Sequence, residues 1–203
     1  MWLKDRVKLR YALWIPAIQV ASTIPALIAG RKFGEVMSIY WKQTTQYTRL
    51  SMNYPSIYTI ITSSLDVEIR KILIPAGVIA TVAILGVLAY YIRNRKFKIT
   101  AEYMLTLAIF TILLCCFCLP VMHERYAYVG ELLAVVYGVM KYRRMAVCAV
   151  LQTIAMITYT RFLFGSTVSE LWPLTLAMLA VILLVGYDLY LQMKEGEGEN
   201  VQA

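Results

Sequence analysis

The chain has 203 residues, of which 60% are hydrophobic and 16% are charged, and its formal net charge is +8 at pH 7. A soluble domain of this size exposes too much surface to contain so few charged residues, so the composition excludes a soluble globular protein. The basic residues are grouped beside apolar segments, which is typical of membrane topology and argues against a nucleic-acid partner.

Six apolar segments are predicted to cross a lipid bilayer as helices, because about 20 apolar residues span its hydrocarbon core. They cover residues 11–30, 72–92, 103–122, 121–140, 145–164 and 171–193. The sequence therefore predicts an all-α polytopic membrane helix bundle, with a single transmembrane domain over residues 1–193. The remaining residues, 194–203, are predicted to form a disordered acidic tail.

Three clusters of basic residues predict the orientation of the chain. They precede the first segment and follow the second and the fourth: Lys4, Arg6, Lys8, Arg10, Arg93, Arg95, Lys96, Lys98, Lys141, Arg143 and Arg144. With six helices these positions share one face, which the positive-inside rule assigns to the cytoplasm, together with both termini. The first segment lacks a small-x-small cleavage site, so we expect it to remain as an anchor, kinked or broken by Pro16 and Pro25.

The loop over residues 31–71 is predicted to lie outside, with a helix over residues 33–47 in the plane of the membrane interface. Its apolar and aromatic positions recur at helical spacing: Phe33, Val36, Met37, Tyr40, Thr44 and Tyr47. A turn over residues 51–55 follows, marked by Pro55. Residues 56–62 are apolar but too few to span, so they are predicted to form a short re-entrant segment shielded by protein.

The same loop carries candidate groups for binding a sugar. Planar amides can bond to sugar hydroxyls, and aromatic rings can stack on sugar rings. The loop offers Gln43, Gln46, Tyr47, Asn53 and Tyr54 for a sugar or acceptor cleft. The alternative is an amphipathic anchor whose aromatic residues only mark the headgroup level.

A second polar stretch, His123, Glu124, Arg125 and Tyr126, interrupts two apolar runs. A fourth helix that begins near Val121 would place these residues in its first turns, at the outer edge of the hydrocarbon. A charged residue at membrane depth is costly, so each is expected to face a partner or a wet cavity. The four cysteines also lie in predicted spans, where packing is favoured over metal binding, and no metal ligands are predicted.

Two interpretations of this stretch stay open. The predicted helix would place Glu124, Tyr128 and Glu131 on one face, with Arg161 of the fifth segment at a comparable depth. In the first interpretation Glu124 forms an ion pair with Arg125 or Arg161. In the second, the arginine forks and the helix N-terminus form an anion site, for which a lipid phosphate is the simplest ligand at this depth.

The two polar stretches resemble one enzyme family. The stretch LPVMHERYAY resembles the Met-His-Glu-Arg-Tyr motif near the last helices of polytopic glycosyltransferases of the GT-C superfamily. Gln43, Tyr47 and then residues 50–55, Leu-Ser-Met-Asn-Tyr-Pro, resemble the family's Gln…Tyr…Leu-Ser-x-Asn-Ala-Pro. The match covers residues 14–128, and it departs at position 54, with Tyr for the usual Ala, and at Ser56, where Asn is common.

The resemblance implies a protein that transfers a sugar, or helps to, from a polyprenyl-phosphate carrier to an extracytoplasmic acceptor. The carrier phosphate would be bound by the group His123, Glu124, Arg125, Tyr126 and Arg161. The expected location is the bacterial inner (plasma) membrane, and the partners are its bilayer and the polyprenyl-phosphate lipid. The donor is the polyprenyl-phosphate-linked sugar, and a divalent cation is left open as a cofactor.

The catalytic residue is not identifiable from the resemblance. Members of the family place an acidic residue, usually Asp, in the first outer loop of a longer chain, and no acidic residue here fits that pattern. The chain therefore resembles the C-terminal half of such an enzyme, and a second chain could supply the N-terminal half. A transporter or flippase for an anionic lipid or saccharide, and a non-catalytic membrane subunit, are the alternative functions.

Overall fold

The computed structural model describes residues 10, 13–46, 50–61, 67–165 and 169–201, and most of them are helical. This confirms the predicted all-α class. The chain divides into two compact units. The first comprises Met1–Thr48 and Ala89–Arg93, and the second comprises Arg49–Leu88 and Asn94–Ala203. Each unit is described on its own.

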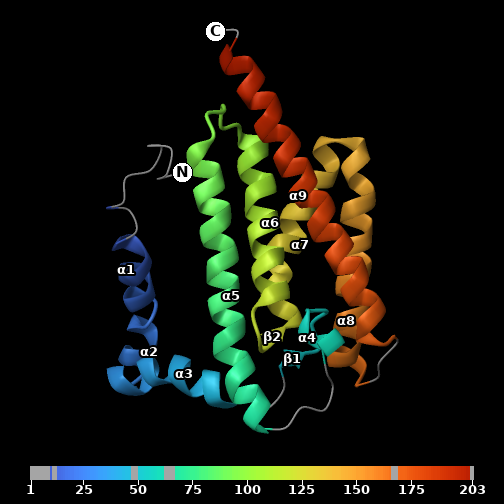
Figure 1. Cartoon of the computed structure of the whole chain (residues 1–203). Coiled ribbons are helices and arrows are strands. Elements are labelled where there is room, and N and C mark those ends of the chain that lie inside the picture. The colour runs from blue at the N-terminus through green and yellow to red at the C-terminus, as the bar shows by residue number, and fades with distance from the viewer. Residues whose placement is uncertain (1–9, 11–12, 47–49, 62–66, 166–168, 202–203) are drawn as a thin grey trace. The chain divides into compact units, whose positions relative to one another are not determined.

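In the first unit, the described residues before Tyr47 form the helices α1 (Trp14–Ala21), α2 (Ile24–Ile28) and α3 (Phe33–Gln46) (Figure 1). The single helix predicted over residues 11–30 is therefore broken into α1 and α2. Pro25 is the physical reason, since it lies in the first turn of α2 and lacks the N–H that would continue the α1 ladder. The helix predicted over residues 33–47 is present as α3 as far as Gln46, and Tyr47 lies outside the described residues.

The second unit is a bundle of long helices. They are α6 (Ala101–Cys118), α7 (Tyr128–Met140), α8 (Met145–Phe164) and α9 (Leu171–Val201), together with α5 (Val67–Asn94) as far as Leu88. Four segments of the described chain are long and apolar enough to cross a membrane: Ile69–Asn94, Ala101–Cys118, Tyr142–Phe164 and Leu171–Glu197. They correspond to four of the six predicted spans, and the chain is an integral membrane protein.

The core of the second unit lies between α6, α7, α8 and α9. Its most buried side chains include Ile109, Leu113, Leu151, Met178, Val181 and Val185. Two glycines of α7 allow close approach of its neighbours. A Cβ on Gly130 would lie 3.0 Å from Ile112 of α6, and a Cβ on Gly138 would lie 2.9 Å from the Cβ of Cys148 on α8. Small residues at helix contacts are the usual means of tight packing in membranes.

The connection between α6 and α7 departs from the predicted helix over residues 121–140. It consists of a short strand, β2 (Met122–His123), and a 3-10 turn, η3 (Glu124–Ala127), so the α-helix begins only at Tyr128. Val121 takes the left-handed conformation, with φ 62°, which a helix cannot contain. The strand β2 pairs with β1 (Ser51–Met52), and the short helix α4 (Tyr58–Ile61) follows β1.

The segment predicted to be re-entrant belongs to the second unit, and its described residues are buried in part, with Ile57 and Ile60 exposed. Tyr54, Ser56 and Tyr58 are all buried, and the Ile57 N–H donates to the Phe117 carbonyl at 3.2 Å. The Tyr58 hydroxyl donates to the carbonyl of Cys118 at 2.9 Å.

Gly77 of α5 lies against the Tyr58 side chain, and a Cβ added at this position would collide with the Tyr58 hydroxyl.

The last helix continues past residue 193, where the disordered tail was expected to begin. α9 is helical as far as Val201. Its end is held by the loop between α5 and α6, because the Lys98 N–H donates to the Gly196 carbonyl at 3.3 Å. Arg95 also lies 3.5 Å from the Glu197 carboxylate. These contacts come from residues distant in the sequence, which composition does not reveal.

A polar cluster joins four helices at the end of the bundle that carries the basic loops. The Arg144 Nη2 atom lies 2.6 Å from Glu102 Oε1 and 2.8 Å from Asp188 Oδ2. Lys141 Nζ lies 2.7 Å from Glu102, and the Tyr137 hydroxyl donates to Asp188 at 2.9 Å. The Arg144 guanidinium also lies 4.5 Å above the Tyr137 ring. This buried arginine is thus matched by two carboxylates and an aromatic face.

Candidate anion site at the β1–β2 pair

Two stretches that are far apart in the sequence meet at the end of the bundle opposite the polar cluster. β1 and β2 run parallel, with Ser51 paired to Met122 and Met52 paired to His123. The Val121 N–H donates to the Leu50 carbonyl at 2.7 Å. A further bridge joins Asn53 to His123. The backbone pairing therefore brings together the two stretches that carry the family resemblance.

The backbone is strained on both sides of this pair. Asn53, just after β1, has φ 64°, and Val121, just before β2, has φ 62°. Asparagine tolerates this left-handed region, but a β-branched valine does not, and such a residue costs about 1–3 kcal/mol. Conformations of this kind persist where the surrounding structure enforces them, and they gather at binding and catalytic sites.

The side chain of Asn53 connects the pair to α8. Its Nδ2 donates to the Thr158 carbonyl at 2.6 Å, and its Oδ1 accepts from Arg161 Nη1 at 3.5 Å. Asn53 therefore contacts both His123, through its backbone, and Arg161, through its side chain. Because both ends of the Asn53 amide contact protein, this residue holds Arg161 in place, whereas the prediction gave it a role in the sugar cleft.

The four residues of the second stretch differ in exposure. His123 and Glu124 are buried, whereas Arg125 and Tyr126 are exposed. The rings of His123 and Tyr126 meet edge to face, with their centroids 5.3 Å apart. Burial lowers the pKa of His123 from its usual 6.5, the Arg125 charge lowers it further, and Glu124 opposes the change. His123 is therefore neutral at neutral pH, where it can donate a hydrogen bond without carrying charge.

The ion pair considered from the sequence does not form. Neither Arg125 nor Arg161 lies within ion-pair distance of the Glu124 carboxylate, although the structure describes all three side chains. Glu124 therefore does not hold Arg125 by direct contact. The two exposed arginines remain available to an anion from outside the protein.

The prediction that Glu124, Tyr128 and Glu131 share one face of a helix is wrong. Glu124 is 6% exposed and Glu131 is 7% exposed, but Tyr128 is 54% exposed. The cause is the 3-10 turn, which places three residues in each turn and so shifts Glu124 relative to the α-helical positions after it. Glu131 instead lies on the buried face of α7 with Ala134 and Tyr137.

Tyr54 is part of the core and does not line an open cleft. Its side chain is 2% exposed, and its hydroxyl lies 3.9 Å from the Met178 sulfur. Burial raises the pKa of Tyr54 well above its usual 10.0, so this hydroxyl stays protonated. Ser56 is also buried. The two positions that depart from the family pattern therefore both contribute to packing.

The remaining candidates lie in or beside the other unit. Gln43 and Gln46 belong to α3, but their side chains lie outside the described residues, as does all of Tyr47. Within the described part of the chain, no group of three His, Cys, Asp or Glu residues could hold a metal ion. The four cysteines are free thiols within α6 and α8.

The polar cluster of Glu102, Arg144 and Asp188 at the opposite end of the bundle was not predicted from the sequence. Glu102 and Asp188 are acidic residues inside or beside apolar runs, a pattern that by itself indicates a buried partner. Arg144 was assigned to the cytoplasmic basic face, yet its side chain is 5% exposed. The lone Asp188 in the last apolar segment was the signal that could have revealed this cluster.

Comparison of the chain with protein-family models, with curated proteins and with solved structures finds no match. The functional assignment therefore depends on the residues of this chain and on their arrangement.

Proposed function

We propose that this membrane protein acts in lipid-linked sugar transfer, as a glycosyltransferase-like protein of the GT-C type. It would transfer a sugar, or help to, from a polyprenyl-phosphate carrier to an acceptor outside the cytoplasm. One observation carries the proposal: the pairing of β1 with β2 joins the two stretches that resemble the family. The strained backbone beside both strands and the nearby arginines support it.

The arrangement suits the departure of a phosphate. In the proposed reaction an acceptor oxygen attacks the anomeric carbon, the bond to the carrier oxygen breaks, and the phosphate keeps the electron pair. Arg125 and Arg161 would stabilise the negative charge that develops on the phosphate. The neutral His123 ring would donate a hydrogen bond to it. No residue of this chain is assigned as the base that removes the acceptor proton, and a second chain is the proposed source of that group.

The proposal includes an orientation in the bacterial inner membrane. The loops that carry Arg95–Lys98 and Lys141–Arg144 would face the cytoplasm with both termini, and the β1–β2 pair would face outside. In a chain freed of its own cysteines, Ser51→Cys should react with an impermeant thiol reagent from outside. Tyr142→Cys, at an 88% exposed position, should react only from inside. The opposite labelling pattern would exclude an outer site.

The anion site is tested with the full chain in detergent and a short polyprenyl phosphate as the probe. Arg125→Ala should weaken binding about tenfold, because a charge-assisted contact is lost. Arg125→Lys should restore little of this binding, because lysine keeps the positive charge but lacks the planar guanidinium that makes two parallel hydrogen bonds. Arg143→Ala removes an exposed arginine at the other end and is the matched control. Unchanged binding by a folded Arg125→Ala protein would refute the proposed function.

One observation favours transport as a second candidate. Glu131 is a buried carboxylate in the bundle, and intramembrane acidic residues commonly lie on substrate or proton paths. A flippase for an anionic lipid would move a fluorescent polyprenyl phosphate between the leaflets of liposomes that contain the protein. Movement that Glu131→Gln abolishes would favour this candidate over sugar transfer.

A further inference from the structure

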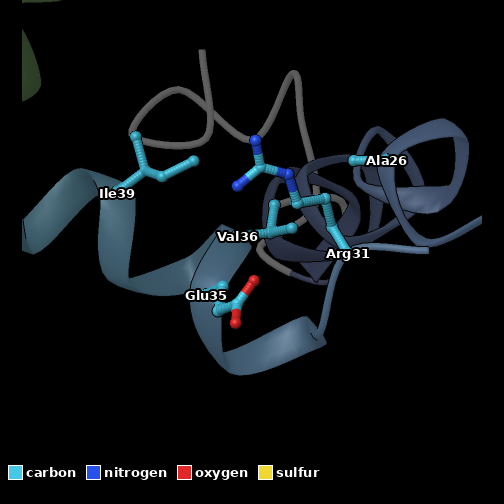
Figure 2. A pocket seen from close by; sticks show the side chains of 5 residues that line it. All are labelled: Ala26, Arg31, Glu35, Val36 and Ile39. Atoms are coloured by element: carbon cyan, nitrogen blue, oxygen red, sulfur yellow. The ribbon is translucent and has the colours of Figure 1, made fainter. Parts of the chain in front are cut away.

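The first unit contains a cavity of about 420 Å³ at the turn between α2 and α3 (Figure 2). Ala26, Val36 and Ile39 give it apolar walls, and Arg31 and Glu35 add one positive and one negative group. The volume falls within the range of small-molecule sites, which combine mostly apolar walls with a few polar groups. Neither polar group belongs to the site at the β1–β2 pair.

The position of Arg31 is fixed by the way α2 ends. Gly30 has φ 87°, and its N–H donates to the Leu27 carbonyl at 3.0 Å. The Arg31 N–H then reaches back to the Ala26 carbonyl, also at 3.0 Å. This pair of bonds is the usual termination of a helix at a left-handed glycine. It sets the backbone of Arg31 close to Ala26 across one wall of the cavity.

The position of Glu35 is fixed by the way α3 begins. The N–H groups of Glu35 and Val36 donate to the Lys32 carbonyl at 3.0 and 3.2 Å. Glu35 thus lies in the first turn of α3, one turn beyond Arg31 in the chain. Both charged residues are therefore placed by short-range backbone bonds, which belong to this unit alone.

The two charges do not neutralise each other. Arg31 and Glu35 are both exposed and lie farther apart than an ion pair, although the structure describes both side chains. Figure 2 shows them extending in different directions, with Val36 between them in this view. The cavity therefore offers a cation and an anion to a ligand that carries both charges.

The cavity lies where an apolar helix gives way to a more polar one. α2 consists of the apolar residues IPALI, and α3 mixes apolar with charged and amide residues. In membrane proteins this transition lies at the depth of the lipid headgroups, where arginine and aromatic residues gather. A ligand at that depth is most simply a lipid of the bilayer.

We propose that this cavity binds the headgroup of a phospholipid with a primary ammonium, of the phosphatidylethanolamine class. The Arg31 fork would bind the phosphate, and the Glu35 carboxylate would accept hydrogen bonds from the ammonium. The apolar walls would contact the glycerol and the first acyl carbons. An anionic lipid would leave Glu35 without a cation, and a choline lipid has no N–H to donate to it. This proposal does not depend on the proposed function.

Native mass spectrometry of the full chain tests it, with an equimolar mixture of phosphatidylethanolamine, phosphatidylglycerol and phosphatidylcholine. The wild type should retain phosphatidylethanolamine about threefold over each competitor, a modest ratio because the charges are exposed. Glu35→Gln should remove the preference over phosphatidylcholine, and Arg31→Gln should reduce retention of all three lipids. Lys32→Gln removes the same charge from the neighbouring position, which does not line the cavity, and should behave as the wild type.

Three outcomes would overturn the proposal. They are equal retention of the three lipids by the wild type, a preference for phosphatidylglycerol, and a loss of lipid retention in Lys32→Gln as large as in Arg31→Gln. Far-ultraviolet circular dichroism of each variant establishes that the helices are retained. Because the substituted side chains are exposed, we expect the spectra to be unchanged.

Discussion

The guanidinium of Arg144 lies 2.8 Å from the carboxylate of Asp188, which fastens the start of α8 to the middle of α9. Its Nη2 atom also bonds Glu102 of α6, so one side chain ties three elements together. This cluster lies at the opposite end of the bundle from the β1–β2 pair. We therefore expect it to determine stability with little direct effect on ligand binding.

Arg144→Met should be strongly destabilising, because it leaves Asp188 without its cation and Glu102 with Lys141 alone. Breaking a buried pair in this way costs about 3–5 kcal/mol. Arg143→Met is the matched control, since Arg143 is exposed beside it, and it should cost under about 0.5 kcal/mol. Thermal unfolding in detergent measures both. Equal melting temperatures for the two variants would show that the cluster does not stabilise the bundle.

Asn53 allows backbone and side-chain effects to be separated. Asn53→Gly keeps the left-handed backbone at φ 64° but removes the amide that contacts Thr158 and Arg161. Asn53→Ala removes the same amide and adds about 1 kcal/mol or more of backbone strain. We expect both variants to weaken polyprenyl-phosphate binding equally, and only Asn53→Ala to lower the melting temperature further. Full binding by Asn53→Gly would show that Arg161 needs no support from this residue.

His123 is the only histidine of the chain, so its contribution to pH dependence can be isolated. Its pKa is lowered from 6.5 in the folded protein, so the unfolded chain binds a proton more readily. The stability associated with neutral His123 is complete above about pH 6.5 and is lost as the pH falls through the lowered folded pKa. The melting temperature should fall from about pH 7.5 to about pH 5.5, and less steeply in His123→Gln. Parallel curves for the two proteins would contradict this.

Glu131 is buried, and no cation of the described chain lies within ion-pair distance of its carboxylate. Glu131→Gln keeps the shape and removes the charge. It should therefore stabilise the folded protein by about 1–2 kcal/mol, because a neutral amide costs less to bury than a carboxylate without a cation beside it. Gln152→Leu is a useful companion, because the Gln152 amide donates to the Glu131 backbone carbonyl at 2.8 Å and not to its carboxylate. A lower melting temperature for Glu131→Gln would show that the charge has a stabilising partner.

Composition was sufficient to predict the long helices, because a helix that crosses lipid needs only an apolar run of the right length. The same reasoning was wrong at residues 121–127. The apolar runs on both sides of this polar stretch favoured one continuous helix, but the β1–β2 pair and the left-handed Val121 make it a strand and a 3-10 turn. The strand β1, which pairs with this stretch, lies before α5 in the sequence. A pattern within residues 121–127 therefore cannot predict the pairing.

The sequence predicted which residues belong to the candidate site, but it did not predict what most of them contact. Polar residues in apolar surroundings identified His123 and Asn53, and the pairing of their backbones brings them together. What they contact was not predictable from spacing. Tyr54 follows Asn53 directly, yet the turn directs one side chain into the core toward Met178 and the other toward α8.

The β1–β2 pair has a consequence for the order in which the protein is made. The carbonyl of Leu50 receives its partner only when Val121 has been synthesised, after the whole of α5 and α6. During translation, the two helices are therefore synthesised while the strand that precedes them still lacks its neighbour. The site at this pair is completed late, so any ligand that depends on it can bind only a chain in which α5 and α6 have already been made.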